Sequence, residues 1–392
     1  MKKRILSLLL CIVAAIGVSA DERIRISHGP YLQNVRQTEA TFVWVASKPS
    51  IGWVELAPDD GTNYYAAERP KYFDTTNGVK NTATVHSVKV TGLKPGTRYR
   101  YRVYATEVTD HKWVEVTYGR TAAIDVFYGK PPVFATRDTS KPETSFAVVN
   151  DIHARKGDIT KLMEAADYKN KEMVIFNGDM ISSLNEEEQI FTGFMDEAIK
   201  LFAKEKPLYY ARGNHETRGP FATMCQRYFS PRDPHLYYMF ADGPVCFVVL
   251  DTGEDKPDND IEYSGITAYD DYRTEQAQWL AQAVKSDEWR QAKWRVVIAH
   301  MPPRPAKDMW HGQEEVLRKF VPILNEAGTD VMLCGHLHRH IMCPADQEVH
   351  FPVIVNSLNH VISGRTEGGT MHLDMYDTDG KVVEKFSVKS RR

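Results

Sequence analysis

The hydrophobic pattern of this chain changes its period near residue 130. Residues 23–128 alternate apolar and polar side chains in short runs such as TATVHSVKV, each bounded by Gly, Pro, Asn or Asp. From residue 145 onward, continuous apolar runs such as VCFVVL are separated by amphipathic stretches with a helical period. Alternation with a period of two is typical of half-buried antiparallel strands, whereas apolar runs separated by helices are typical of α/β domains. We therefore predict an all-β sandwich over 23–128 and an α/β domain over 145–392, joined by a proline-rich linker at 129–144.

The α/β half can be divided further. Helices are expected at 186–204, 273–285 and 312–326, where apolar residues recur with a helical period. Two strand-like segments flank Asp379-Gly380, a pair that is typical of hairpin turns. The buried strands are expected at SFAVVN, EMVIFN, PLYYAR, VCFVVL, WRVVIAH, DVMLC and FPVIVN.

The first twenty residues have the pattern of a secretory signal peptide. Lys2, Lys3 and Arg4 precede an apolar run, and Val18-Ser19-Ala20 offers a small-residue cleavage site. We therefore predict export to the periplasm or the extracellular space, with no transmembrane segment elsewhere in the chain. The formal net charge is −3 and there is no basic block, so nucleic acid is not expected as a partner.

Export permits disulfides, but the cysteine positions favour free thiols. Cys246 and Cys334 lie inside apolar runs that are expected as buried strands. Together with Cys225 and Cys343 they make up the cysteines that remain after the signal peptide.

Polar side chains follow five of the expected strands at the point where each strand ends. The carboxyl ends of parallel strands meet at one edge of a sheet, where α/β proteins build their sites. Each position has an ordinary explanation by itself, as a helix cap or a turn residue, but all five together favour a site. His336 and His338 are two residues apart, so in extended backbone both would point to one side. The strand-end residues are Asp151 with His153, Asp179, Asn214 with His215, His300, and His336 with His338.

These residue types are suited to a pair of metal ions. Carboxylate oxygens are ligands for hard ions, and imidazoles bind zinc, iron or manganese. A single anionic side chain can bridge two ions, and two ions about 3.5–4 Å apart can activate water and hold a phosphoryl oxygen.

In their order, the motifs D-x-H, G-D, G-N-H-E, H and G-H-x-H resemble the calcineurin-like metallophosphoesterase superfamily, over about residues 145–375. The resemblance implies a four-layer α/β/β/α sandwich and two ions of Fe, Mn or Zn. It also implies a metal-dependent phosphoric ester hydrolase, in which a metal-bound hydroxide attacks phosphorus. The implied ligands are Asp151, His153, Asp179 and His338 for the first ion, and Asp179, Asn214, His300 and His336 for the second.

The same resemblance implies two catalytic residues. Asp179 would bridge the ions, and His215 would face the phosphate or the leaving group. Substrate contacts are expected from Asn214 and His215. Arg155 would either pair with a phosphate oxygen or remain solvated.

The N-terminal half has resemblances of its own. GLKPGTRYRYRV (92–103) resembles a fibronectin type III domain with Tyr99 at its corner, and GPYLQ (29–33) resembles the N-terminal domain of purple-acid-phosphatase-like proteins. The catalytic half departs from that group. Ser182 stands where those enzymes have a tyrosine ligand, and His153 stands where they have glycine. The metal site is therefore expected to be of the general D-x-H type, without a tyrosinate ligand.

We expect an exported hydrolase of small phosphate monoesters. The alternatives are a phosphodiesterase acting on nucleotides or lipid head groups, and a non-catalytic binding protein stabilised by metal. The acidic loop 251–273 would either border the site or form a solvated surface, and His340 is expected at the surface.

Overall fold

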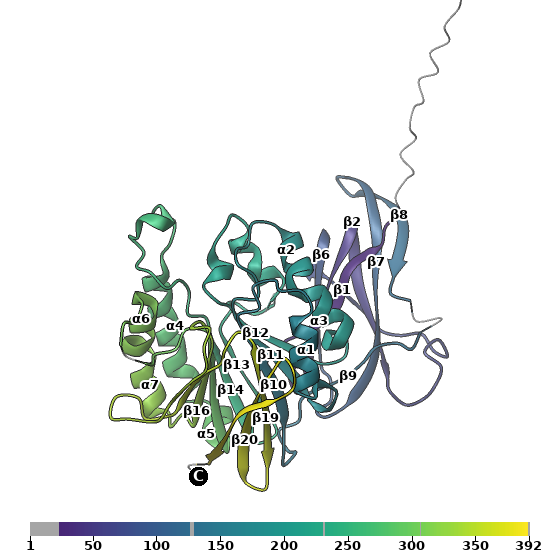
Figure 1. The fold of residues 1–392 in the computed structure, drawn as a ribbon. Coiled ribbons are helices and arrows are strands. Elements are labelled where there is room, and N and C mark those ends of the chain that lie inside the picture. The colour runs from purple at the N-terminus through teal and green to yellow at the C-terminus, as the bar shows by residue number, and fades with distance from the viewer. Residues whose placement is uncertain (1–22, 126–128, 230–231, 306, 391–392) are drawn as a thin grey trace, which may run out of the picture.

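The computed structural model describes residues 23–125, 129–229, 232–305 and 307–390, and the predicted signal peptide at 1–20 lies outside them. Two parts follow one another along the chain, an all-β part and a layered α/β part (Figure 1). None of the helices in the described ranges is both long and apolar enough to cross a membrane.

The all-β part is organised around β2, a strand of 20 residues. Its first half pairs with β1 and β6, its second half with β3 and β7, and a register shift between Val45 and Ser50 separates the two halves. Phe42, Trp44 and Val54 join the core of the all-β part, whereas Val43 and Val45 point to the opposite face and join a core shared with the α/β part. The strands are β1 (Ile26–Gln33), β2 (Glu39–Pro58), β3 (Lys71–Phe73), β4 (Thr75–Thr76), β5 (Val79–Lys80), β6 (Thr82–Thr91), β7 (Arg98–Lys112) and β8 (Glu115–Ala123).

The stretch expected as a linker is partly a strand of the all-β part. Within 129–144, β9 (Val133–Ala135) pairs antiparallel with β7. The side chain of Phe134 is 1% exposed and packs edge-on against Phe42. A strand of three residues is too short to show a period of two. The prolines on either side of it are typical of a linker, which is why a linker was expected here.

Two sheets form the α/β part. One runs in the order β21-β20-β19-β10-β11-β12, the other in the order β13-β14-β15-β16-β18-β17. β10 to β12 are mutually parallel, as are β14, β15, β16 and β18. The strands are β10 (Ser145–Val149), β11 (Met173–Asn177), β12 (Leu208–Ala211), β13 (Tyr238–Asp242), β14 (Val245–Leu250), β15 (Trp294–Ala299), β16 (Val331–Cys334), β17 (Ile341–Cys343), β18 (Val353–Val355), β19 (His360–Glu367), β20 (Thr370–Asp377) and β21 (Val382–Lys389).

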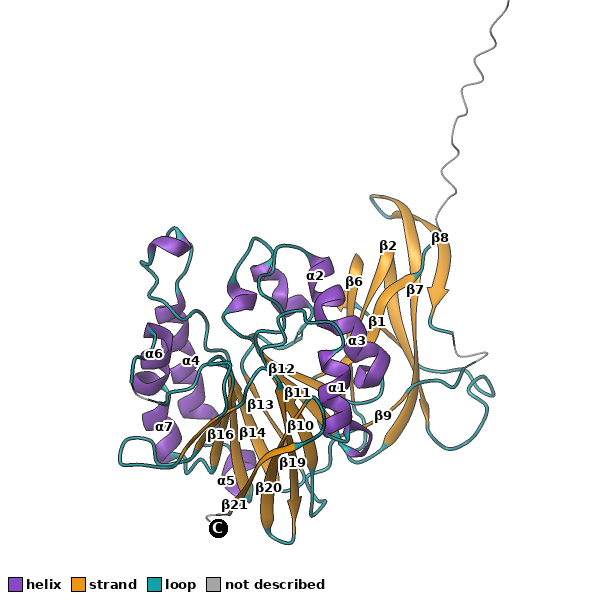
Figure 2. Cartoon of the chain, viewed as in Figure 1, coloured by secondary structure: helices purple, strands orange, loops and turns teal. Residues whose placement is uncertain are grey.

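Helices cover the outer face of each sheet (Figure 2), which confirms the four-layer α/β/β/α sandwich. Along β10, Phe146 and Val148 join the core between the sheets, whereas Ala147 and Val149 join the core under the helices. The alternation of a β-strand thus supplies two cores at once. The helices are α1 (Asp158–Ala165), η1 (Tyr168–Asn170), α2 (Glu187–Ile190), η2 (Phe191–Met195), α3 (Asp196–Ala198), η3 (Ile199–Ala203), η4 (His215–Thr217), η5 (Ala222–Arg227), η6 (Ile261–Tyr263), α4 (Tyr269–Ala283), α5 (Asp287–Gln291), α6 (His311–Lys319) and α7 (Val321–Glu326).

The cysteines of the described residues are free, as predicted. Cys225, Cys246 and Cys334 are buried, and Cys343 is partly exposed.

The two parts share a sheet, which was not predicted from the residue pattern. β1 pairs in parallel with β12 through Gln33 and Leu208, so most strands of the all-β part and the first sheet of the α/β part form one sheet of 13 strands. The hydroxyl of Tyr101 also donates to the carbonyl oxygen of Lys204 at 2.7 Å. The all-β part is therefore attached to the strand that leads directly into the candidate site.

A buried polar chain also connects the two parts. Asp74 is 3% exposed and His86 is fully buried. The Ser50 hydroxyl lies 2.8 Å from Nε2 of His86, whose Nδ1 lies 3.3 Å from Asp74. Arg232, from the α/β part, donates to the same carboxylate. Burial by itself would raise the pKa of Asp74, but hydrogen bonds from His86 and Asn81 and the charge of Arg232 lower it below its usual value.

We expect Asp74→Asn to lower the free energy of unfolding at pH 7 by roughly 3 kcal/mol, because the buried His86 and the partly buried Arg232 lose a charged partner. A depressed folded-state pKa stabilises the protein above the unfolded pKa of about 4, and that contribution is lost as the pH falls further. The difference from the wild type should therefore shrink between pH 7 and about pH 3 in urea unfolding. The exposed turn variant Asp379→Asn serves as the control. An equal difference at both pH values would contradict this account.

Candidate metal centre

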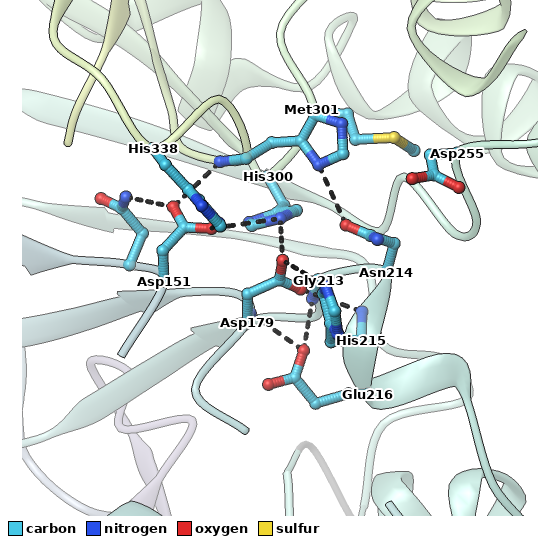
Figure 3. Close-up of polar contacts among 12 residues, drawn as sticks. Asp151, Asp179, Gly213, Asn214, His215, Glu216, Asp255, His300, Met301 and His338 are labelled. Carbon is cyan, nitrogen blue, oxygen red and sulfur yellow. Dashed lines mark hydrogen bonds and ion pairs between the residues drawn. The ribbon is translucent and has the colours of Figure 1, made fainter. Parts of the chain in front are cut away.

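The strand-end residues meet at one edge of the sandwich, where both sets of parallel strands end (Figure 3). Asp151, Asp179 and Asn214 follow β10, β11 and β12 of one sheet. His300 and His336 follow β15 and β16 of the other. Both sheets therefore contribute to a single centre.

The side chains form two groups with ligand atoms close enough to hold one ion each. In the first group, the ligand atoms of Asp151, His153, Asp179 and His338 all lie within 4.8 Å of one another. The same limit holds for Asp179, His300 and His336 in the second group.

Asp179 is common to both groups. Its Oδ2 lies 3.0 Å from Nε2 of His300. Asn214 extends the second group, because its Oδ1 lies 3.0 Å from Nδ1 of His336. The structure thus brings together all seven metal ligands predicted from the sequence.

The loops that carry these side chains are strained. Asp151 (φ 53°), His153 (φ 48°) and Asp179 (φ 54°) lie in the left-handed region, as do His336 (φ 73°) and His338 (φ 55°). Such backbone costs about 1 kcal/mol or more for each residue other than glycine and clusters at functional sites. The expectation that His336 and His338 lie in extended backbone is wrong. A tight turn brings them together instead.

Two buried polar atoms of the centre are left for a ligand. Asp151 Oδ1 and His300 Nε2 make no hydrogen bond of regular geometry with any described residue. The remaining atoms of both side chains are engaged. Asp151 Oδ2 accepts from the His336 N–H at 2.9 Å, and His300 Nδ1 lies 2.8 Å from the carbonyl oxygen of Asn177. This contact places the ring proton on Nδ1 and leaves Nε2 as the donor atom for a metal. The residues present therefore fit a metal centre.

The charges of the centre support the same conclusion. Burial lowers the pKa of both His153 and His336 to about 4, so these imidazoles are neutral, as metal binding requires. Burial also acts to lower the pKa of His300, but the facing carboxylate of Asp179 outweighs it and raises that pKa to about 10. Asp179 thus favours a positive charge at the position that a metal cation would fill.

Comparison with known proteins agrees with this geometry. The sequence profile of the calcineurin-like phosphoesterases matches residues 144–340, just over half of the chain. The chain belongs to the calcineurin-like phosphoesterase family. A second profile, for the N-terminal domain of purple acid phosphatases, matches residues 28–121.

Individual relatives of this phosphoesterase are distant. Purple acid phosphatase 21 of Arabidopsis thaliana is 23% identical over 66% of this chain and 53% of its own length. Purple acid phosphatase 15 of the same plant is 22% identical over 74% of this chain and 52% of its own length. The chain thus spans about half the length of these curated relatives. A purple acid phosphatase from yellow lupin seeds has a similar fold, with a TM-score of 0.69 and 14% identity over 93% of this chain and 74% of its own.

Arg155 was expected either to pair with a phosphate oxygen or to remain solvated, and in the structure it is bonded to other parts of the phosphoesterase. Its guanidinium donates to Asp158 at 2.7 Å, to the Asp151 carbonyl at 3.0 Å and to the Leu358 carbonyl at 2.7 Å. These bonds direct the side chain toward the protein, where it positions the Asp151 loop. Ser182, which stands in place of a tyrosine, lies 3.3 Å from Nδ1 of His153 and orients that ring.

Two further expectations need correction. His340 is not a surface residue, because its side chain is 15% exposed and pairs with Glu384.

The loop 251–273 is only partly solvated. Glu254 and Asp255 are buried, whereas Ile261 and Ile266 are exposed. Glu254 contacts the hydroxyl of Thr217, which also contacts the Asn214 carbonyl, so the first part of this loop lies next to the turn that follows Asn214.

A third group, Asp270, His311 and Glu315, also has ligand atoms within 4.8 Å of one another. Lys319 pairs with Glu315, and Arg273 lies 3.0 Å from Asp270. The cations of the protein already neutralise this group, so it does not form a second centre.

Glu216 is the functional residue that the sequence interpretation missed, although it belongs to the G-N-H-E motif. The side chain is 1% exposed and accepts backbone N–H groups of Asp179 (3.0 Å), Met180 (2.6 Å) and Gly213 (3.0 Å). It therefore ties the loop after β11 to the loop after β12. Burial and the charge of Asp179 raise the pKa of Glu216 to about 7.

Gly213 is required at this junction, because a Cβ atom there would overlap the backbone and carboxylate of Asp179. The two loops can approach so closely only with glycine at this position.

We expect Glu216→Gln to lower the free energy of unfolding by roughly 2–4 kcal/mol. The glutamine NH₂ group replaces one accepting oxygen and would face backbone N–H groups, which are also donors. The misplaced loops should also bind metal more weakly. Urea unfolding and metal analysis after dialysis would measure the two effects. Glu164→Gln, an exposed change on α1, should leave both unchanged. Normal stability and metal content in Glu216→Gln would refute this role.

Proposed function

We propose that this chain is an exported metallophosphoesterase that hydrolyses phosphate monoesters at a dinuclear centre. The observation that carries the proposal is the buried carboxylate of Asp179, which belongs to two adjacent groups of metal-ligating side chains. Export rests on the signal-peptide pattern of residues 1–20. Preference for monoesters is supported by the match of the N-terminal part to purple acid phosphatases and by the names of the curated relatives.

The ligand sets follow from the two groups. When bound, the ions would supply Lewis acidity, lowering the pKa of water and holding the oxygens of the phosphoryl group. Asp151, His153, Asp179 and His338 would hold the first ion, and Asp179, Asn214, His300 and His336 would hold the second.

His215 is placed to act on the substrate without being a ligand. Its Nδ1 lies 2.8 Å from the carbonyl oxygen of Ser182, and its Nε2 lies 3.8 Å from Asp179 Oδ2. The first contact fixes the ring, and the second places Nε2 at the edge of the centre (Figure 3). In its protonated form Nε2 would give a proton to the oxygen of the departing alcohol. Its side chain is 26% exposed, so a substrate can reach it.

Metal occupancy is the first test. We expect about two ions per chain in the wild type. Because Asp179 serves both groups, Asp179→Asn should lose both ions, whereas His336→Ala should lose only the second. Elemental analysis after gel filtration would count them. His350→Ala, at an exposed position, is the control. Equal losses in the Asp179 and His336 variants would contradict a shared carboxylate.

Activity is the second test. Protein lacking residues 1–20, supplied with Mn, Zn or Fe, should hydrolyse 4-nitrophenyl phosphate at least about tenfold faster than bis(4-nitrophenyl) phosphate, measured as kcat/KM. Asp179→Asn should lower both rates by about a thousandfold or more. His215→Ala should reduce kcat while leaving the metal content unchanged. Faster diester hydrolysis would replace the monoester proposal with a phosphodiesterase.

A further inference from the structure

A cavity of about 770 Å³ lies between the loop 251–268 and the segment 212–223. This volume is within the range of about 300–1,000 Å³ that is typical of small-molecule sites. Its walls include the side chains of Arg218, Glu254, Tyr263, Ile266, Tyr269 and Tyr272. None of the predicted metal ligands lines it, and the preceding proposal assigns it no role.

The cavity adjoins the metal centre through one short turn. η4 (His215–Thr217) directly follows Asn214, and Thr217 and Arg218 line the cavity. The hydroxyl of Thr217 contacts the Asn214 carbonyl at 2.7 Å and Glu254 at 2.8 Å. A 3₁₀ turn of three residues rises about 6 Å. A phosphate ester held at the centre could therefore extend its alcohol part into the cavity.

The charged side chains of the cavity are already paired within the protein. Arg218 donates to Glu254 at 2.7 Å, and Arg212 lies 2.9 Å from Asp251. Glu262 pairs with Lys256. The cavity thus offers no free cation to a second phosphate or carboxylate, and its acidic groups would repel one. An uncharged group is the occupant that this charge pattern favours.

The remaining wall is aromatic and apolar. The hydroxyls of Tyr263 and Tyr272 donate to acidic residues, Tyr263 to Glu254 at 2.6 Å and Tyr272 to Asp251 at 2.9 Å. Because the hydroxyls are engaged, the tyrosines present their rings to the cavity. Ile266 also lines the pocket and is 88% exposed, so its side chain adds apolar surface that an occupant would cover.

We propose that this cavity is a leaving-group pocket, which receives the alcohol part of the phosphate ester and selects an uncharged aromatic alcohol. The inference rests on the proposed function and specifies its substrate class. Stacking against the tyrosine rings and burial of apolar surface would favour an aryl or arylmethyl group over a short alkyl group.

The test compares benzyl phosphate with propyl phosphate, two esters of primary alcohols that differ in the ring. Phosphate release by the metal-loaded protein gives kcat/KM for each. We expect a benzyl-to-propyl ratio of kcat/KM of about ten or more.

Two variants test the pocket itself. Ala268 is exposed and lines the pocket, so Ala268→Trp would fill it. This variant should lower the benzyl-to-propyl ratio to about three or less, because benzyl phosphate loses its site. Ile266→Asp should lower the ratio mainly by raising KM for benzyl phosphate.

Ile261→Asp is the matched control, because Ile261 is 92% exposed on the same loop and does not line the pocket. It should keep the wild-type ratio. The leaving-group proposal would be wrong if both esters are hydrolysed with a ratio near one. It would also be wrong if both pocket variants leave the ratio unchanged. Either result would leave the phosphoesterase proposal intact. If the metal-loaded protein hydrolyses neither ester, the proposed function fails and the pocket fails with it.

Discussion

The carboxylate of Asp179 is the point on which the rest of the centre depends. It is 1% exposed, and a buried charge is costly unless other groups compensate it. His300 faces it at 3.0 Å from the second sheet, and the His215 N–H donates to it at 2.9 Å from the first. Compensation of this buried charge thus draws groups from both sheets to one point. Because Glu216 adds a second buried carboxylate nearby, a cation at this position would stabilise the fold as well as provide chemistry.

The scaffold around Asp179 is rigid enough to carry strained loops. Left-handed backbone at Asp151, His153 and His338 would relax if the strands before them could move. Each of these strands is held by a hydrophobic core on both of its faces. In β10, for example, Val148 packs into the core between the sheets and Val149 packs into the core under the helices. The all-β part contributes to the same rigidity. Its strand β1 pairs with β12, which ends three residues before Asn214. The all-β part and the predicted ligand Asn214 are therefore linked by a few residues of continuous chain and sheet.

Much of the centre could be predicted from the sequence because strand ends are local features. An apolar run followed by Asp151 or Asp179 indicates a buried strand, and it also indicates that the aspartate lies at the sheet edge where that strand ends. Contacts between distant segments could not be predicted in this way. Arg155 lies close to the D-x-H motif, yet its guanidinium reaches the Leu358 carbonyl more than 200 residues away. Glu216 acts by accepting backbone N–H groups, and the partners of a backbone group leave no pattern in the residue types.

Periodicity and turn residues act over short distances, so the order of the elements, the all-β and α/β parts and the set of predicted strand-end ligands could all be derived from the sequence. The left-handed turn at His336 and His338, the shared sheet through Gln33 and Leu208, and the pocket beside Thr217 emerged only in three dimensions. The sheet and the pocket are built from segments far apart in the chain, and the turn is held by the Asp151 carboxylate, which accepts from the His336 N–H. The mutual placement of such segments is set by packing in three dimensions, which no single stretch of residues encodes.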